Sequence, residues 1–218
     1  MTMTSSPSER HAARDAMTNS PAEWDERYSS TAQMFSGRPN GALVTEVSGL
    51  QPGRALDVGC GEGGDAVWLA GRGWQVTALD VSRVALDRAA LRAQDAGVHV
   101  EWLQSGIEDA PLAPGAFDLV SAQYPALLRT PGKDAERALL EAVAPGGILL
   151  FVHHADIDVE EAKARGFDPN DYVLPPNVAA LLGDDWEVTV HERRPRDVPA
   201  GAGAQHTHDV VLRAHRLR

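Results

Sequence analysis

The chain has 218 residues, 43% of them apolar, and carries 31 Asp and Glu against 20 Lys and Arg, a formal net charge of −11. That length suits a single domain with its own core, and the acidic balance argues against a nucleic-acid or anionic-membrane partner, because phosphate contacts need a basic face. The single cysteine excludes a disulfide framework within the chain, and no apolar run approaches the ~20 residues of a membrane helix, so we expect a soluble, cytoplasmic protein.

Two segments precede the first glycine-rich strand. Residues 1–20 are polar and lack the apolar run of a secretory signal, so we expect a mobile arm. Residues 21–52 are expected to form a helical lid. Ser20, followed by proline and by an acid three residues on, is typical of a helix start, and this helix is expected to run to about Phe35. A Gly/Pro loop over residues 36–41 then leads into a second helix.

Residues 53–218 alternate short apolar strands with helices. We expect strands over residues 55–58, 74–79, 98–103, 117–122, 148–152, 186–191 and 208–213, and helices over 65–70, 82–96, 134–143 and 176–182. Strands separated by helices form right-handed βαβ units. Only a Pro/Gly/Ala loop separates the last two strands, so the final strand is expected to run antiparallel, beside the fifth. The sequence therefore predicts one α/β domain: a Rossmann-like, doubly wound seven-stranded sheet, mostly parallel with the last strand antiparallel, plus the lid.

The most informative stretch is the glycine-rich segment 55–65, ALDVGCGEGGD, in which a strand turns into a helix. Such a turn brings backbone N–H groups close to a ligand at the carboxyl ends of parallel strands. Its glycines also satisfy the G-x-G-x-x-G spacing of dinucleotide enzymes. Asp57 suits a cofactor with an ammonium group and would repel a pyrophosphate, or else it bonds loop N–H groups. Asp80, at the end of the next strand, can accept both hydroxyls of a ribose, or else cap the following helix.

Four motifs in this order resemble class I S-adenosylmethionine-dependent methyltransferases. They are the string Leu56–Gly63, the acid-ending strand 76–80, the Phe-Asp-Leu-Val motif at 117–120 and the Ala-Pro-Gly-Gly turn at 144–147. Within that family, the lid resembles the small-molecule branch related to tellurite-resistance and thiopurine methyltransferases. The resemblance implies S-adenosylmethionine as the cofactor and a small-molecule methyl acceptor as the partner.

The resemblance also implies roles at the cofactor. Asp57 and the backbone of the glycine turn would hold the methionine end, and the acid that ends the second strand would hold the ribose. The family usually has an acid before Ile107, but this chain has Gly106 there, so we expect Glu108, in preference to Asp109, to receive the adenine amino group. The expected cofactor-binding residues are Asp57, Gly59, Cys60, Gly61, Asp80, Val81, Ile107, Glu108 and Gln123.

Aromatic side chains and one arginine are expected on the substrate side. Trp24 and Tyr28 lie one turn apart on the first helix, and Tyr124 follows the fourth strand. Aromatic faces suit a cationic sulfonium, although ordinary packing of the lid explains them equally well. The expected substrate-binding residues are Trp24, Tyr28, Arg38 and Tyr124.

Four histidines are expected to meet at the ligand edge of the sheet. His153 and His154 end the fifth strand, whereas His206 and His208 begin the antiparallel strand beside it, so we expect the two pairs within about 10 Å of each other. Three interpretations stay open: a general base or substrate-binding set, a metal site of two or three imidazoles, and strand-end histidines that bond loop carbonyls. We assign all four as catalytic candidates and assign no metal ligands.

The expected function is methyl transfer from S-adenosylmethionine to a small molecule. Two alternatives remain at this point. The glycine spacing leaves room for an NAD(P)-dependent oxidoreductase, which Asp57 counts against. A non-catalytic S-adenosylmethionine-binding protein would keep the same pocket without turnover.

Overall fold

The computed structural model describes residues 19–164, 168–196 and 206–218, so the expected arm lies almost wholly outside the described residues. All seven expected strands form. In chain order the elements are α1 (Pro21–Ser29), α2 (Gly41–Val47), β1 (Arg54–Val58), α3 (Gly64–Ala70), β2 (Gln75–Asp80), α4 (Arg83–Asp95), β3 (Val100–Gln104), β4 (Phe117–Gln123), α5 (Asp134–Ala142), β5 (Val143–His154), α6 (Val159–Ala164), a short 3-10 helix (Pro169–Asp171), α7 (Pro175–Ala179), β6 (Trp186–Pro195) and β7 (His208–Arg216).

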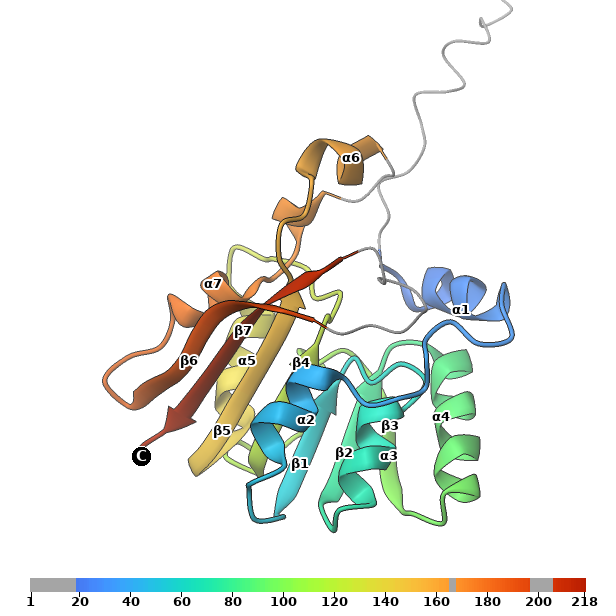
Figure 1. The fold of residues 1–218 in the computed structure, drawn as a ribbon, viewed down its shortest axis with the longest axis horizontal. Helices are drawn as coiled ribbons and strands as arrows, with labels where there is room; N and C mark the ends of the chain where they lie inside the picture. The colour runs from blue at the N-terminus through green and yellow to red at the C-terminus, as the bar shows by residue number, and fades with distance from the viewer. Residues whose placement is uncertain (1–18, 165–167, 197–205) are drawn as a thin grey trace, which may run out of the picture.

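The strands form one sheet in the order β3-β2-β1-β4-β5-β7-β6 (Figure 1). The pairs β1–β2, β1–β4, β2–β3 and β4–β5 are parallel, whereas β7 is antiparallel to both β5 and β6. This arrangement confirms the predicted fold class and the predicted place of the final strand. Because the strand order reverses between β1 and β4, a ligand crevice is expected at the carboxyl ends of these strands.

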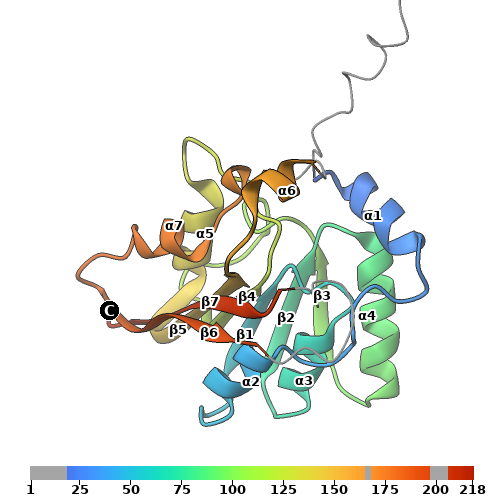
Figure 2. The same cartoon turned by 45° about the horizontal axis from the view of Figure 1, so that its top comes forward.

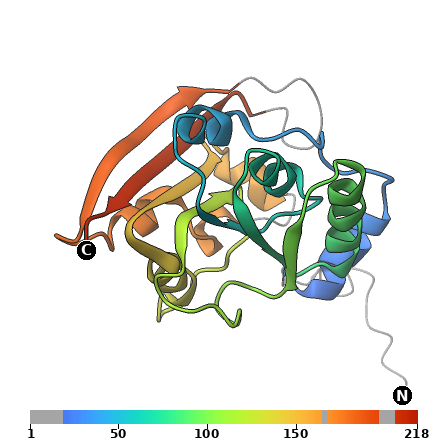
Figure 3. The same cartoon turned by 90° about the horizontal axis from the view of Figure 1, so that it is seen from below.

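Helices cover both faces of the sheet. Figure 3 shows α2 and α3 on one face and α5 and α7 on the other, and Figure 2 shows α1 beside α4. Leu43 of α2 and Leu69 of α3 belong to one buried apolar cluster. Leu139 of α5 and Val178 of α7 belong to a second. The sheet therefore lies between two buried apolar layers, and the ends of its strands remain available to form a binding site.

The first helix is shorter than predicted. Its start is confirmed: Ser20 caps α1, and a capping box with Glu23 completes the first turn. The helix ends at Ser29 instead of running to Phe35. The difference arises because backbone N–H groups of the following residues donate to the side chain of Glu62 on the glycine turn, and not to carbonyls of a continued helix.

The predicted turn at residues 144–147 is also different, because it lies inside β5. Val143 pairs with Phe117, and the register between β4 and β5 then shifts before Leu119 pairs with Ile148. Gly146 has φ +80°, which a glycine adopts without a Cβ penalty. The strand therefore begins directly after α5 and carries a bulge. No helix in residues 19–164, 168–196 or 206–218 is long and apolar enough to cross a membrane.

Candidate functional site

A cavity of about 690 Å³ lies at the carboxyl ends of β1, β2 and β4, beside α1. The structure brings most of the predicted site residues together there. The predicted residues that line it are Trp24, Tyr28, Asp57, Gly59, Cys60, Gly61, Asp80, Val81, Ile107, Glu108, Gln123, Tyr124 and His154. A second cavity of about 210 Å³, lined by Trp24, Tyr124, His153 and His154 among others, adjoins it.

The glycine loop, residues 59–64, connects β1 to α3. Gly59 and Gly61 have φ values of +69° and +52°, in the left-handed region that glycine adopts most easily. The N–H groups of Gly59 and Cys60 donate to the carbonyl of Leu79, at 2.9 and 3.0 Å, which ties the loop to β2. A Cβ on Gly61 would lie 2.9 Å from the hydroxyl of Tyr28. Glycine is thus needed both for the turn and for the close approach of α1.

Asp80 holds this loop in shape. Its two carboxylate oxygens accept the N–H groups of Gly61 and Ser82, each at 2.9 Å, and Ser82 then caps α4 through the N–H of Ala85. Burial raises the pKa of Asp80, and these backbone hydrogen bonds oppose the rise. The N-cap residue of α4 is therefore Ser82, and Asp80 supports it instead of capping the helix itself. A carboxylate has about four acceptor sites, so these bonds leave capacity for a ligand in the cavity.

Asp57 is the least satisfied acid of the site. It is 2% exposed, and its Oδ2 atom has no hydrogen-bond partner among the described residues. Burial, and then the charges of Asp65 and Asp80, raise the pKa of Asp57 well above the ordinary carboxyl range. Gln123, from the end of β4, resembles it: its amide donates to Ser121, but its buried Oε1 has no donor in the described part of the chain. Both residues line the cavity, and a cationic donor bound there would satisfy these two atoms.

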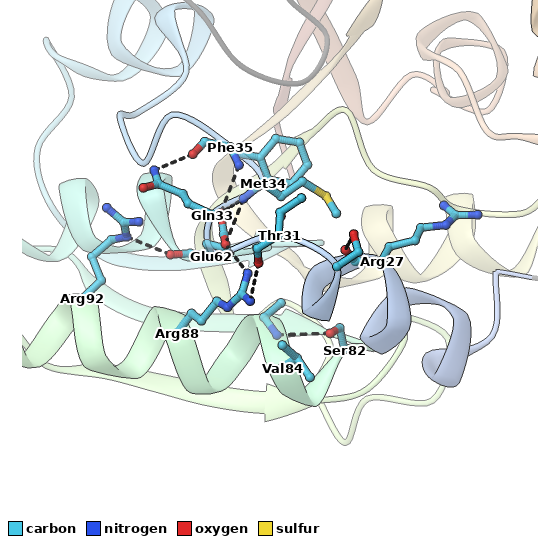
Figure 4. Close-up of polar contacts among 12 residues, drawn as sticks. Arg27, Thr31, Gln33, Met34, Phe35, Glu62, Ser82, Val84, Arg88 and Arg92 are labelled. Atoms are coloured by element: carbon cyan, nitrogen blue, oxygen red, sulfur yellow. Dashed lines mark hydrogen bonds and ion pairs between the residues drawn. The ribbon is translucent and has the colours of Figure 1, made fainter.

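Two acids that the sequence analysis missed fasten the N-terminal segment, residues 19–40, onto the glycine loop. Figure 4 shows the first of them, Glu62. Glu62 is 3% exposed. Its carboxylate accepts the N–H groups of Met34 and Phe35 at 3.1 and 3.0 Å, and it pairs with Arg88 of α4 at 2.9 Å. Figure 4 also shows Arg88 reaching Thr31, whose carbonyl accepts from it at 2.7 Å. The sequence did offer a signal for this contact: two acids, Glu62 and Asp65, flank the two glycines at the start of α3.

Asp65 is the second of these acids. It accepts both the backbone N–H and the side-chain amide of Asn40, at 2.7 and 2.8 Å, and burial raises the pKa of Asp65 to about 6. The carbonyl of Arg38 lies 2.9 Å from the position of a Cβ on Gly64, so residue 38 packs by its backbone. Its side chain is exposed and outside the cavity lining. The structure therefore does not bring Arg38 to the site, contrary to the prediction.

A third acid joins α1 to the start of α4. Asp25 accepts the hydroxyl of Ser82 at 2.6 Å and the N–H of Val84 at 3.0 Å, which lowers the pKa of Asp25. Ser82 therefore bonds to Asp25 while its N–H donates to Asp80. One serine thus links the N-terminal segment and the first turn of α4 through its hydroxyl, and the end of β2 through its N–H group.

The two histidine pairs meet as predicted. The rings of His154 and His206 stack with their centroids 4.1 Å apart, and the ring of Tyr124 stacks on His154 at 4.4 Å. His153 is buried, and burial, with His154 beside it, lowers the pKa of His153 to about 4. His208 lies 2.9 Å from the hydroxyl of Thr207 and outside both cavity linings. Only His154 of the four lines the larger cavity.

An acid and an arginine that were not assigned to the site complete this cluster. Asp209 is the register partner of His154 across β5 and β7, and it accepts the hydroxyl of Tyr124 at 2.7 Å. The Nε of Arg196 lies 3.4 Å from Asp209, and its guanidinium lies 4.7 Å above the ring of Tyr124. These contacts hold Tyr124 at φ +53°, a conformation uncommon for a bulky side chain. Among the described residues, no group of three or more His, Cys, Asp or Glu could hold a metal ion, which leaves the metal interpretation without a site there.

Comparison with known proteins identifies the domain that carries this cavity. Residues 55–147, which span β1 to the bulge of β5, match the family model of a methyltransferase domain. This stretch, which is less than half of the chain, is similar to a methyltransferase domain. This match confirms the resemblance to S-adenosylmethionine-dependent methyltransferases at the level of the family. The narrower resemblance to tellurite-resistance and thiopurine enzymes stays a prediction.

Two curated relatives share the methyltransferase domain. A malonyl-[acyl-carrier protein] O-methyltransferase of Enterobacter lignolyticus is 37% identical over 122 residues, which are 56% of this chain and 47% of that protein. A ubiquinone biosynthesis O-methyltransferase of Chromobacterium violaceum is 38% identical over 100 residues, 45% of this chain and 43% of that protein. The matched part thus spans less than half the length of either relative.

Solved structures share the fold over nearly the whole chain. A protein from a study of the conversion of a disulfide into a thioacetal in echinomycin biosynthesis superimposes with a TM-score of 0.72 at 23% identity, covering 90% of this chain and 92% of that one. The N-methyltransferase NodS of Bradyrhizobium japonicum, solved with S-adenosyl-L-homocysteine, gives a TM-score of 0.62 at 21% identity and covers 96% of both chains. At these identities, the likeness concerns the fold of the methyltransferase domain and its flanking elements.

Proposed function

We propose that this protein transfers a methyl group from S-adenosylmethionine to a small-molecule acceptor. The observation that carries the proposal is a pair of buried acceptor atoms without a donor among the described residues, Asp57 Oδ2 and Gln123 Oε1, on two residues that line the cavity. An ammonium group brings three donors and a positive charge, and the methionine end of the cofactor carries one. The residues present therefore fit this cofactor. When bound, it supplies a methyl group on a cationic sulfonium.

The adenosine end of the cofactor also fits residues that line the larger cavity. Asp80 has acceptor capacity for the ribose, while the buried Ile107 and the half-buried Val81 offer apolar surface to the adenine. A Cβ on Gly106 would lie 3.0 Å from Oε2 of Glu108. The carboxylate of Glu108 therefore occupies the space that a side chain at position 106 would enter. This supports the replacement of the missing acid by Glu108.

The N-terminal segment would act as the lid over this cofactor. Trp24 and Tyr28 line the cavity from α1, with their rings 6.1 Å apart, and aromatic faces stabilise a nearby cation. The carboxylates of Glu62 and Asp65 hold the lid against the glycine loop. We assign residues 21–52 to the lid and 53–218 to the core of one domain.

Holding the acceptor against the methyl group is the main task left to the protein, since alignment alone lowers the barrier by several kcal/mol. The geometry supports His154, stacked between Tyr124 and His206, as the histidine that contacts the acceptor. His153 and His208 are less suited, because neither lines the larger cavity.

The two alternatives receive less support. An NAD(P) pyrophosphate would meet the carboxylates of Asp57, Glu62 and Asp65 around the glycine loop, and the domain match is to methyltransferases. A binding protein without turnover would show the same cavity but release no product. The proposal includes a cytoplasmic location, consistent with a single cysteine and a small-molecule substrate.

Isothermal titration with S-adenosylmethionine, S-adenosylhomocysteine and NAD tests the cofactor. We expect both sulfur nucleotides to bind and NAD not to bind. Release of S-adenosylhomocysteine in the presence of a panel of small acids, phenols, amines and thiols tests turnover. Binding of NAD in preference to the sulfur nucleotides would refute the proposal, and binding without release across the panel would favour the non-catalytic alternative.

A further inference from the structure

Charge is divided between the two ends of the site. The carboxylates that line the larger cavity surround the glycine loop and the segment after β3; they are Asp57, Glu62, Asp65, Asp80, Glu108 and Asp109. The opposite end is lined by His154 and Arg196. The adjoining cavity is lined by Arg27, His153 and His154, and its described lining contains no Asp or Glu. In a chain with a net charge of −11, the guanidinium groups of Arg27 and Arg196 make this wall locally cationic.

The contacts of His154 fix where its ring carries a proton. Its Nδ1 lies 3.1 Å from Nη1 of Arg196, within hydrogen-bond distance, and 3.7 Å from Oδ1 of Asp209, beyond that distance. A guanidinium only donates hydrogen bonds, so Nδ1 of His154 must be the acceptor. A neutral ring that accepts at Nδ1 carries its proton on Nε2. The second nitrogen therefore offers an N–H donor, and a nitrogen that already holds a proton is not a general base.

The acid that balances Arg196 lies behind the wall. Asp209 is 3% exposed and belongs to neither cavity lining. It accepts the hydroxyl of Tyr124 and lies 3.4 Å from Nε of Arg196. A ligand in the cavity consequently meets the guanidinium and the imidazole N–H before it meets this carboxylate. The stacking of His154 between Tyr124 and His206 holds the donor in place.

The adjoining cavity has room for a flat apolar group. It shares Trp24, Tyr124, Pro125, Ala126 and His154 with the larger cavity, so the two are neighbours. Tyr172 adds a further aromatic ring to its wall. Aromatic and small apolar side chains of this kind bind planar ring systems through their faces.

We propose, resting on the function proposed above, that the acceptor binds as an anion: a carboxylate on a flat apolar body, with its charge at Arg196 and at the Nε2–H of His154. Its body lies in the adjoining cavity, against Trp24 and Tyr172. His154 and Arg196 orient the acceptor.

The test compares benzoate with its neutral isostere benzamide, on protein saturated with S-adenosylhomocysteine, by ligand-detected NMR titration. We expect benzoate to bind about tenfold more tightly than benzamide, as for a hydrogen bond to a charged group. Arg196→Gln should abolish this preference and leave benzamide binding unchanged, whereas Arg196→Lys should retain it in part. Arg193→Gln is the matched control, since Arg193 is exposed and pairs with Asp156 outside both cavities.

His154→Phe gives a second test, because it keeps a ring between Tyr124 and His206 but removes the donor. We expect a smaller loss of the benzoate preference than in Arg196→Gln. Affinity for S-adenosylhomocysteine, measured for each variant, shows that the variant is folded. The proposal is overturned if benzamide binds as well as benzoate, if benzoate does not bind, or if the preference survives Arg196→Gln. Failure of the parent protein to bind S-adenosylhomocysteine would instead overturn the proposed function.

Discussion

Replacing Asp57 with asparagine removes one charge from the site and almost no volume. In the proposed complex, the carboxylate accepts a hydrogen bond from an ammonium group, a contact that contributes about 1.5–3 kcal/mol. The Asp57→Asn variant should therefore bind S-adenosylmethionine about 10- to 150-fold more weakly, since 1.4 kcal/mol is a factor of ten. Methylthioadenosine, which lacks the amino-acid tail, should bind to the variant and to the parent protein equally well.

The same substitution should have the opposite effect on the ligand-free protein. Burial raises the pKa of Asp57 above its value in the unfolded chain, so the folded state binds more protons, and stability is lost as pH rises above the ordinary carboxyl range. An asparagine does not titrate. The variant should therefore melt at a higher temperature than the parent at pH 8, and this gain should shrink as the pH falls toward 4.

Isothermal titration with both nucleotides and thermal melting from pH 4 to 8 measure these two effects. Asp87→Asn is a matched control, because Asp87 is exposed on α4 and pairs with Arg83 away from the cavity. If Asp57→Asn weakens S-adenosylmethionine and methylthioadenosine by the same factor, Asp57 does not hold the ammonium group. A ligand-free variant less stable than its parent at pH 8 would contradict the argument from burial.

Three further predictions concern the rest of the site. Glu62→Gln removes the charge that faces Met34 and Phe35, so amide hydrogen exchange in both residues should accelerate while α4 is unchanged; equal rates would mean that Glu62 does not hold the lid. Glu108→Gln should reduce the preference for S-adenosylhomocysteine over its inosine analogue by about tenfold in titrations, and an unchanged preference would remove Glu108 from the adenine site. Binding of S-adenosylhomocysteine should release protons at a pH above the ordinary carboxyl range, because an ammonium group favours the ionised form of Asp57, whose pKa is raised. Titration in two buffers of different ionisation enthalpy detects the release, and proton uptake would refute the assignment.

The sheet could be predicted from the sequence because its strands contain short apolar runs, the first of which leads into glycine and the second of which ends in an acid. The cofactor side of the cavity could be predicted for a similar reason, since the glycine loop is contiguous and Asp80 ends the next strand. Contacts between distant segments could be predicted only where strand pairing dictates them, as for the two histidine pairs. Glu62 reaches back to Met34, and Arg196 reaches across to His154, and no local pattern encodes such pairings. The early end of α1 has the same origin, because the carboxylate of Glu62 accepts N–H groups that would otherwise bond within a longer helix.

The acceptor end of the site depends on one cross-strand register. His154 and Asp209 face each other because β5 and β7 pair at that point. Side chains alternate between the faces of a strand, so inserting or deleting one residue near the start of β7 would turn Asp209 to the opposite face and leave His154 without it. The cofactor end is built on β1, β2 and the glycine loop, at a distance from β7 in the strand order. Under the proposal above, inserting or deleting one residue there would change acceptor recognition, whereas the cofactor-binding end of the site would keep its structure.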